Sequence, residues 1–240
     1  MVTDNPRDYA VQRMFDRIAG RYDLLNRVIS FRLDTWWRNQ AIRTVLSGDH
    51  PLILDLGAGT GDLTFAAAKA VHGNGRIVGL DFSPHMLRVA QEKQSRAAYG
   101  DKTHFVLGSA LLPPFQDAVF DGVMTAFVLR NVSNLSLFFG HAFRVLKPGG
   151  RFVSLDMFPP SQGWFSALYG FYFYRLMPCL GGLLTHDPSA YKYLSESVRK
   201  FHSPGHIADI MRHCGFERVA IRRFLNGAVC IHVAEKCKNR

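Results

Sequence analysis

An apolar run, a glycine-rich loop and a helix-forming stretch follow one another between residues 51 and 71. The run PLILDLG (51–57) is typical of a buried strand, the loop carries the motif DLGAGTGD (55–62), and GDLTFAAAKAV (61–71) suits a helix. Strand, glycine loop and helix in this order open a parallel α/β sheet that binds a nucleotide-like ligand. The details of the loop decide which ligand that is.

Strand-like and helical stretches alternate along the rest of the chain. The other strand candidates are 75–82, 104–110, 120–127, 150–158, 217–225 and 228–236. Ser83 and Pro84 form a typical helix start, LKPGG (146–150) indicates a turn, and Asn226-Gly227 indicates a hairpin. The pattern predicts an α/β, Rossmann-like fold. Its sheet is mostly parallel and seven-stranded, with a C-terminal antiparallel hairpin.

The glycine loop discriminates between ligands. The phosphate loop of triphosphatases needs a lysine after its last glycine, and none follows Gly61. The dinucleotide fingerprint is G-x-G-x-x-G, but here Asp62 stands at the third glycine, at the helix start where a pyrophosphate would bind. A carboxylate there repels a diphosphate. Asp55 and Asp62 instead favour a cationic ligand, and S-adenosylmethionine carries both a sulfonium and an amino group.

Two later strand ends extend this prediction. Asp81 ends the second strand, where an acidic residue accepts hydrogen bonds from ribose hydroxyls in dinucleotide and adenosylmethionine enzymes alike. Ser109 follows the third strand, where a side chain commonly contacts the adenine. The predicted cofactor contacts are Asp55, Gly57, Gly59, Thr60, Asp81, Ser109 and Ala110.

Composition and charge bear on partners and compartment. The chain has 240 residues with a formal net charge of +10, carried by scattered basic residues, which leaves general solubility, nucleic acid and an anionic membrane as explanations. The aromatic residues are not interleaved with basic ones, so we expect no nucleic-acid partner. The four cysteines suit neither zinc nor a disulfide framework, and the N-terminus lacks a secretion signal. We expect a cytoplasmic protein.

Several stretches resemble known methyltransferases. The glycine loop, Asp81 and LKPGG resemble class I adenosylmethionine-dependent methyltransferases. FDRIAGRYDLLNRVISFRLDTWWR (15–38) and RVLKPGGRFVSLDMF (144–158) are similar to the two signatures of the ubiquinone/menaquinone biosynthesis C-methyltransferase family. The segments AFVLRNV (126–132), YKYLSESVRKF (191–201) and the closing NGAVCIHVAEK also fit, so the resemblance covers nearly the whole chain. The departures from the family pattern are Leu25, Asp34, Ser109, Asp156 and Phe158.

The resemblance implies an activity and a catalytic set. Members of this family methylate a ring carbon of a prenylated quinol, which becomes nucleophilic when a neighbouring hydroxyl ionises. Arg130 is the candidate stabiliser of the developing oxyanion, because arginine is always positively charged and is a poor base. Asn131 would orient Arg130 or the quinol. Tyr22 and Asp23 are candidates for closing the site, with Asp23 as a candidate base. Methyl transfer to carbon needs no metal.

The substrate choice stays open at this point. Demethylmenaquinol is the first expectation; the benzoquinol precursor of ubiquinone, a phytyl naphthoquinol and another small molecule are the alternatives. The apolar stretch 163–184, within an expected substrate-side insertion at 163–200, suggests a greasy entrance resting on an anionic membrane. Residues 1–45 would form a helical cap over a methyltransferase domain at 46–240. We also expect a homodimer.

Overall fold

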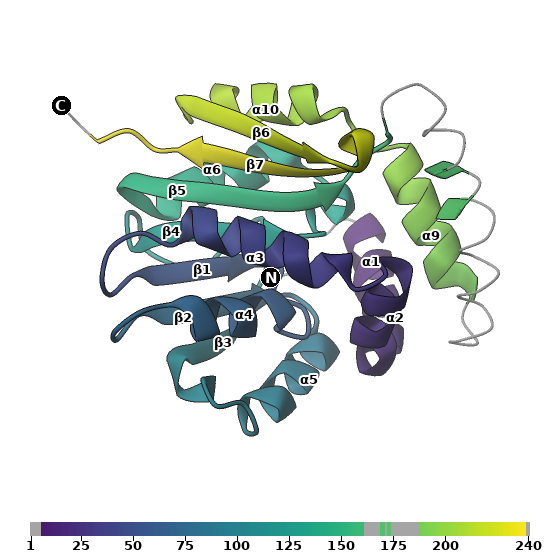
Figure 1. Ribbon diagram of the computed structural model, residues 1–240, viewed down its shortest axis with the longest axis horizontal. Helices are drawn as coiled ribbons and strands as arrows, with labels where there is room; N and C mark the ends of the chain where they lie inside the picture. Colours follow the sequence, from purple (N-terminus) through teal and green to yellow (C-terminus); the bar gives the residue numbers. More distant parts are fainter. Residues whose placement is uncertain (1–5, 161–168, 171, 174–187, 239–240) are drawn as a thin grey trace.

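The computed structural model describes residues 6–160, 169–170, 172–173 and 188–238. Seven strands form one sheet in the order β3-β2-β1-β4-β5-β7-β6 (Figure 1). Neighbouring strands are parallel except where β7 pairs with β5 and with β6, and these two pairings are antiparallel. The fold class predicted from the sequence is confirmed. The strands are β1 (Leu52–Leu56), β2 (Arg76–Asp81), β3 (Thr103–Leu107), β4 (Phe120–Ala126), β5 (Leu146–Met157), β6 (Arg218–Phe224) and β7 (Val229–Glu235).

Helices cover both faces of the sheet. Alternate residues of β1 point to opposite faces: Ile53 packs in a layer under α3 and α4, while Leu54 and Leu56 pack in a layer under α6 and α10. Ser83 caps α5 as expected, its hydroxyl accepting the backbone N–H of Met86 at 3.0 Å. The helices that flank the sheet are α3 (Leu33–Val45), α4 (Asp62–Ala70), α5 (Pro84–Gln94), α6 (Leu135–Val145) and α10 (Pro204–His213).

Three more helices gather where the parallel strands end. They are α1 (Pro6–Ile18), α2 (Tyr22–Ile29) and α9 (Pro188–Arg199), and Figure 1 shows them beyond the carboxyl edge of the sheet. In parallel α/β sheets this edge is where ligands bind. The three N-terminal helices therefore lie in two places. Helices α1 and α2 lie at this edge, whereas α3 packs against β4, β5 and α4.

Two boundaries differ from the sequence prediction. LKPGG was predicted as a turn before a strand, but it lies within β5 as an irregularity. Phe120 pairs with Leu146 and Gly122 with Arg151, so β5 has extra residues that bulge out, and Gly149 has a φ of +82°. The third strand ends at Leu107, and residues 108–110 form a loop that leads into the site.

Most of the apolar stretch 163–184 lies outside the described residues. Tyr169, Gly170, Tyr172 and Phe173 are described, and Tyr169 and Phe173 stack with their ring centroids 5.2 Å apart. Within the described part of the chain, no helix combines the length and the apolar character needed to cross a bilayer.

Candidate active site

The glycine loop between β1 and α4 folds tightly against the end of β2. The backbone N–H groups of Gly57 and Ala58 both donate to the carbonyl of Leu80, at 2.8 and 3.0 Å. Gly57 has a φ of +77°, and a Cβ there would lie 2.5 Å from Val128 Cγ2, so only glycine fits. A Cβ on Gly59 would meet no atom within 4 Å, because this residue borders the pocket.

Asp81 accepts a hydrogen bond from the glycine loop and also lines the cofactor cavity. Its Oδ2 accepts the Gly59 N–H at 2.8 Å and its Oδ1 accepts the Ser83 N–H at 2.9 Å. Burial raises the pKa of Asp81 to about 6, against the lowering effect of the Ser83 and Gly59 hydrogen bonds. Each carboxylate oxygen can accept a second hydrogen bond, so Asp81 can receive two adjacent hydroxyl groups, as a ribose offers.

Asp55 is a buried carboxylate with an incomplete set of partners. Its Oδ2 accepts the Thr64 hydroxyl at 2.7 Å, while Oδ1 is buried and has no hydrogen-bond partner among the described residues. Burial raises the pKa of Asp55 to about 7, with Thr64 and Arg38 lowering it and Asp81 raising it. A buried acceptor without a donor is unfavourable, so Asp55 Oδ1 is suited to accept a hydrogen bond from a ligand donor, above all a cationic one.

Replacing Asp55 by asparagine is expected to stabilise the cofactor-free protein at pH 8. The folded pKa of about 7 lies above the ordinary aspartate pKa of 3.8. The favourable contribution of the protonated form is therefore complete below about pH 4 and is lost as the pH rises through about 7. Asparagine avoids ionisation, so D55N should gain roughly 2–4 kcal/mol at pH 8 and much less at pH 5. Urea unfolding at both pH values measures this, and a D55N protein less stable at pH 8 would contradict it.

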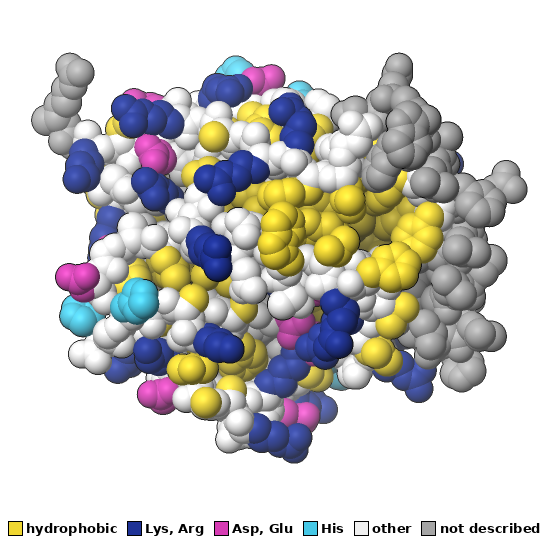
Figure 2. Space-filling model, in the orientation of Figure 1, with side chains coloured by type: hydrophobic (Ala, Val, Ile, Leu, Met, Phe, Trp, Pro, Cys, Tyr) yellow, Lys and Arg dark blue, Asp and Glu magenta, His cyan; other side chains and the backbone are white. Residues whose placement is uncertain are grey.

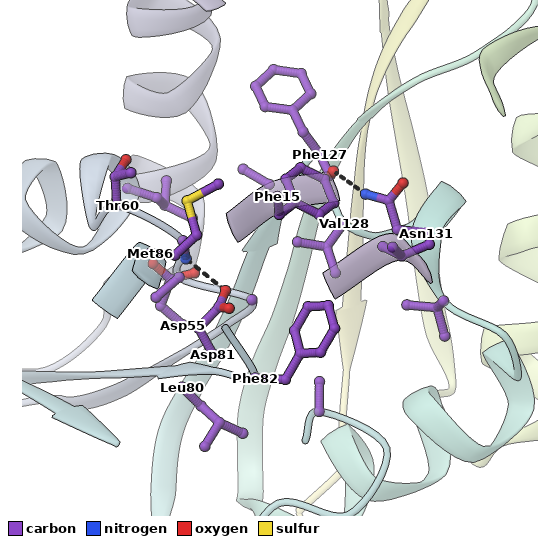
Figure 3. A pocket seen from close by; sticks show the side chains of 18 of the residues that line it. Phe15, Asp55, Thr60, Leu80, Asp81, Phe82, Met86, Phe127, Val128 and Asn131 are labelled. Atoms are coloured by element: carbon purple, nitrogen blue, oxygen red, sulfur yellow. Dashed lines mark hydrogen bonds between the residues drawn. The ribbon is translucent and has the colours of Figure 1, made fainter. Parts of the chain in front are cut away.

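One cavity collects the predicted cofactor residues beneath α1 (Figure 3). Asp55, Asp81 and Met86 lie at one side of it, and Phe127 and Asn131 lie across from them. The side chain of Gln12 on α1 donates to the Phe82 carbonyl at 2.8 Å, which fixes this helix over the opening. All seven predicted cofactor contacts line the cavity, namely Asp55, Gly57, Gly59, Thr60, Asp81, Ser109 and Ala110.

The sequence argument from Asp62 needs a correction. Asp62 borders the cavity, but its Oδ1 pairs with Lys93 Nζ at 2.8 Å, so its charge is largely compensated. Lys93 also pairs with Asp23 of α2, whose Oδ1 accepts the Thr60 hydroxyl at 2.5 Å. Asp62 therefore takes part in the ion pairs through which Lys93 links α2 to the glycine loop. The preference for a cationic ligand rests on Asp55 instead.

The predicted catalytic residues do not all border the cofactor cavity. Tyr22 and Asn131 line it, whereas Asp23 does not. Arg130 lies behind Asn131 and borders two neighbouring cavities under α2. Asn131 is held by its Nδ2, which donates to the Phe127 carbonyl at 3.3 Å, and by its Oδ1, which accepts the Tyr193 hydroxyl at 3.0 Å.

Arg130 is anchored by a buried carboxylate. Its NH1 donates to Asp156 Oδ1 at 2.5 Å, and Asp156 is fully buried. Burial raises the pKa of Asp156, while Arg130 and the N–H groups of Met157 and Leu129 lower it. Arg130 Nε is also buried and donates to no described residue. One side of the guanidinium is thus fixed by Asp156, and the residue borders the two cavities under α2.

An apolar cavity adjoins Arg130 on the side away from the glycine loop. Phe127 borders both this cavity and the cofactor cavity, so the two cavities adjoin at this residue. The ring also contacts two cations, with Arg38 Cζ 5.1 Å and Arg130 Cζ 5.9 Å from its centroid. The other lining residues are mostly apolar and aromatic and include Ile29, Phe31, Leu33, Trp37, Met157, Tyr169, Tyr172, Phe173, Leu194 and Val229.

Several site residues escaped the sequence prediction. Phe15 and Arg38 border the cofactor cavity, Phe127 borders both cavities, and Tyr193 donates a hydrogen bond to Asn131. Phe15 and Arg38 are the first and last residues of the stretch 15–38, so the similarity of that stretch was the available signal. Within the described ranges, no cluster of three His, Cys, Asp or Glu side chains could hold a metal ion.

The cavity has complementary groups for each part of one cofactor. Asp55 requires a cationic donor, Asp81 offers acceptors to a diol, and no basic cradle for a diphosphate lies in the loop. Together with the sheet topology, these groups favour S-adenosylmethionine over a dinucleotide and indicate the class of Rossmann-like methyltransferases.

Comparisons with known proteins narrow this class. The profile of the ubiE/COQ5 methyltransferase family matches residues 2–236. The chain is 41% identical to the demethylmenaquinone methyltransferase of Thermus thermophilus, over 93% of this chain and 100% of that protein. It is 37% identical to the ubiquinone/menaquinone biosynthesis C-methyltransferase UbiE of Geotalea daltonii, over 94% of this chain and 96% of that protein. The chain therefore belongs to the ubiE/COQ5 methyltransferase family.

A solved structure supports the fold independently of close sequence similarity. An S-adenosylmethionine-dependent methyltransferase from Aquifex aeolicus superimposes with a TM-score of 0.63 at 16% identity, covering 89% of this chain and 97% of that one. At this identity the likeness shows the fold alone.

Proposed function

We propose that this protein transfers a methyl group from S-adenosylmethionine to a ring carbon of a prenylated quinol, with demethylmenaquinol as the first substrate. The observation that carries the proposal is the near full-length similarity to a protein named demethylmenaquinone methyltransferase. The apolar, aromatic cavity that adjoins the cofactor cavity at Phe127 suits a fused aromatic ring with a hydrocarbon tail.

The residues divide the chemical work between them. S-adenosylmethionine supplies an electrophilic methyl group, and the protein must make a ring carbon nucleophilic and hold it in line. Ionisation of a neighbouring hydroxyl does this, and Arg130 would stabilise the resulting oxyanion with a nitrogen not used by Asp156. Asn131, fixed by Tyr193, would position the quinol.

The two cap residues receive different roles. Tyr22 borders the cofactor cavity and packs edge-on against Phe15, with ring centroids 5.9 Å apart, so it would exclude water from the site. Both carboxylate oxygens of Asp23 are engaged, one by Thr60 and one by Lys93. Asp23 would therefore hold α2 onto the glycine loop and not act as the base.

The decisive experiment is a methylation assay with a set of acceptors. Purified protein and methyl-labelled S-adenosylmethionine are incubated with demethylmenaquinol, a demethylated benzoquinol precursor of ubiquinone, a phytyl naphthoquinol or a tail-free phenol. Label on a ring carbon of demethylmenaquinol, at the highest kcat/KM of the set, is the expected result. Faster methylation of the benzoquinol would shift the assignment to ubiquinone synthesis, which the name of the Geotalea daltonii relative includes. Label only on the phenol would contradict the proposal.

An apolar patch marks where the substrate would enter from a membrane. The patch consists of the exposed side chains of Phe31, Leu33, Trp36 and Leu225. Figure 2 shows an apolar area between α3 and the β6–β7 turn. Phe31, Leu33 and Leu225 also line the apolar cavity, so patch and cavity are continuous.

Two exposed arginines belong to the same surface. Arg32 lies between the patch residues Phe31 and Leu33 in the chain, and Arg222 of β6 is on the sheet face that α3 covers. Aromatic side chains beside basic ones suit the headgroup region of an anionic bilayer. These features support the proposal that the protein, expected in the cytoplasm, binds the membrane surface peripherally with the patch facing lipid. The homodimer stays a prediction.

Substituting Phe31 by asparagine is expected to weaken binding to anionic vesicles about tenfold. Phe31 is 72% exposed at a φ of +51°, a conformation that asparagine tolerates, so the backbone is kept while an aromatic ring is removed. Co-sedimentation with phosphatidylglycerol vesicles measures the effect. Leu112→Asn, which removes an exposed leucine outside the patch, is the control. Equal binding by wild type and F31N would contradict the patch assignment.

A further inference from the structure

Arg38 on α3 is a buried cation whose hydrogen-bonding capacity is not used. The residue is 6% exposed, and its Nε donates no hydrogen bond to any described residue. The nearest carboxylate oxygen, Asp34 Oδ2, is 3.7 Å from Nε, too far for a hydrogen bond. A guanidinium carries five N–H donors, and burying it without acceptors is unfavourable. Its conformation therefore needs another explanation.

The position of Arg38 points to a ligand. Arg38 borders the cofactor cavity together with Asp55, and its guanidinium lies over the ring of Phe127. Asp55 Oδ1 is likewise buried and has no partner among the described residues. The cavity is thus bordered by a guanidinium whose Nε lacks an acceptor and by a carboxyl whose Oδ1 lacks a donor, and the two groups are close enough for Arg38 to lower the pKa of Asp55.

A purely structural role explains Arg38 less well. Asp34 already accepts the Ser30 hydroxyl on Oδ1 at 2.8 Å, so its pairing with Arg38 is not needed to satisfy that oxygen. A charge pair formed only for stability would bring Arg38 and a carboxylate within hydrogen-bond distance, since the desolvation of both groups is otherwise not repaid. The lengthened contact leaves the guanidinium free to turn toward the cavity.

We propose that Arg38 binds the carboxylate of the amino-acid end of S-adenosylmethionine, while Asp55 binds its ammonium group. A zwitterionic amino acid matches the two opposite unsatisfied charges, whereas an isolated cation or anion matches only one. The planar fork of arginine fits a carboxylate with two parallel hydrogen bonds. This inference rests on S-adenosylmethionine as the cofactor and adds a residue that determines which end groups the cofactor must carry.

The test compares two ligands that differ only in that carboxylate. Calorimetric titration is carried out with S-adenosylhomocysteine and with its decarboxylated analogue, which keeps the ammonium group, the thioether and the adenosine. The proteins are wild type, Arg38→Gln, Arg38→Lys and the matched control Arg43→Gln, which removes an exposed arginine from the same helix. Thermal unfolding without ligand monitors the fold of each variant.

Wild type and R43Q should bind S-adenosylhomocysteine about 10- to 100-fold more tightly than the decarboxylated analogue. R38Q should lose this preference, because the substitution should weaken binding of S-adenosylhomocysteine and leave binding of the decarboxylated analogue unchanged. R38K should retain part of the preference. If R38Q does not fold, the drop in preference in R38K decides. Equal weakening of both ligands would overturn the proposal and leave Arg38 as a structural residue. Failure of wild type to bind S-adenosylhomocysteine would instead overturn the cofactor assignment, and this proposal with it.

Discussion

Replacing Arg130 by lysine is expected to lower kcat for quinol methylation by about 100- to 1,000-fold. Removal of one preorganised donor to a developing oxyanion has an effect of this size. Lysine keeps the positive charge that buried Asp156 requires, so the fold should survive. Its single ammonium group cannot both hold Asp156 and present a second nitrogen toward the quinol, as the guanidinium can.

Binding measurements separate this effect from a loss of cofactor. Arg130 does not line the cofactor cavity, so the Kd of R130K for S-adenosylhomocysteine should stay within about threefold of the wild-type value. Arg212→Lys is the matched control, because Arg212 pairs with Asp209 at 2.7 Å in an exposed setting. Unchanged kcat in R130K would remove Arg130 from the catalytic set. A matching fall in cofactor affinity would make it a structural residue.

Replacing Asp81 by asparagine is expected to weaken S-adenosylhomocysteine binding by at least about 100-fold. The carboxylate would accept two charge-assisted hydrogen bonds from the ribose, each strong enough to change affinity tenfold or more. Asparagine keeps the size of the side chain but replaces one acceptor by an NH₂ group. That group would face the N–H of either Gly59 or Ser83, so the glycine loop would also lose a contact.

Unfolding does not explain the expected loss. Burial raises the pKa of Asp81 to about 6, so its ionised form is unfavourable in the cofactor-free fold at pH 8, and a neutral asparagine avoids this. Calorimetric titration measures the affinity. Asp121→Asn is the control, since Asp121 accepts the Leu52 N–H at 2.8 Å and pairs with Lys147 outside the cofactor cavity. Affinity retained within threefold in D81N would contradict the assigned ribose contact.

The parts of the site that were predictable are local in the chain or tied to strand ends. The glycine loop follows β1 directly, and Asp81 ends β2, which pairs with β1, so the two must meet at one edge of the sheet. The same rule brings Arg130, after β4, close to Asp156 on β5. The contact between Arg130 and Asp156 was not predicted, and Asp156 was noted only as a departure from a family pattern.

The parts that were missed depend on tertiary packing. Arg38 reaches the cavity because α3 packs against β4 and β5, and Phe15 does so because α1 contacts α5. The spacing of residues near the glycine loop predicts neither of these packing contacts. Asp62 was misread for the same reason: its partner Lys93 comes from α5, and a charge is compensated only when the fold brings its partner close.

The most direct test of the account is a crystal structure of the protein with S-adenosylhomocysteine and a short-tailed demethylmenaquinol. We predict the cofactor beneath α1 with its ribose on Asp81, and the quinol ring beside Asn131, directly against the position of the cofactor methyl group, with a hydroxyl oxygen beside Arg130. The ring carbon next to that hydroxyl should face the cofactor sulfur. A quinol bound elsewhere, or with its ring turned away from Arg130, would contradict the proposed reaction.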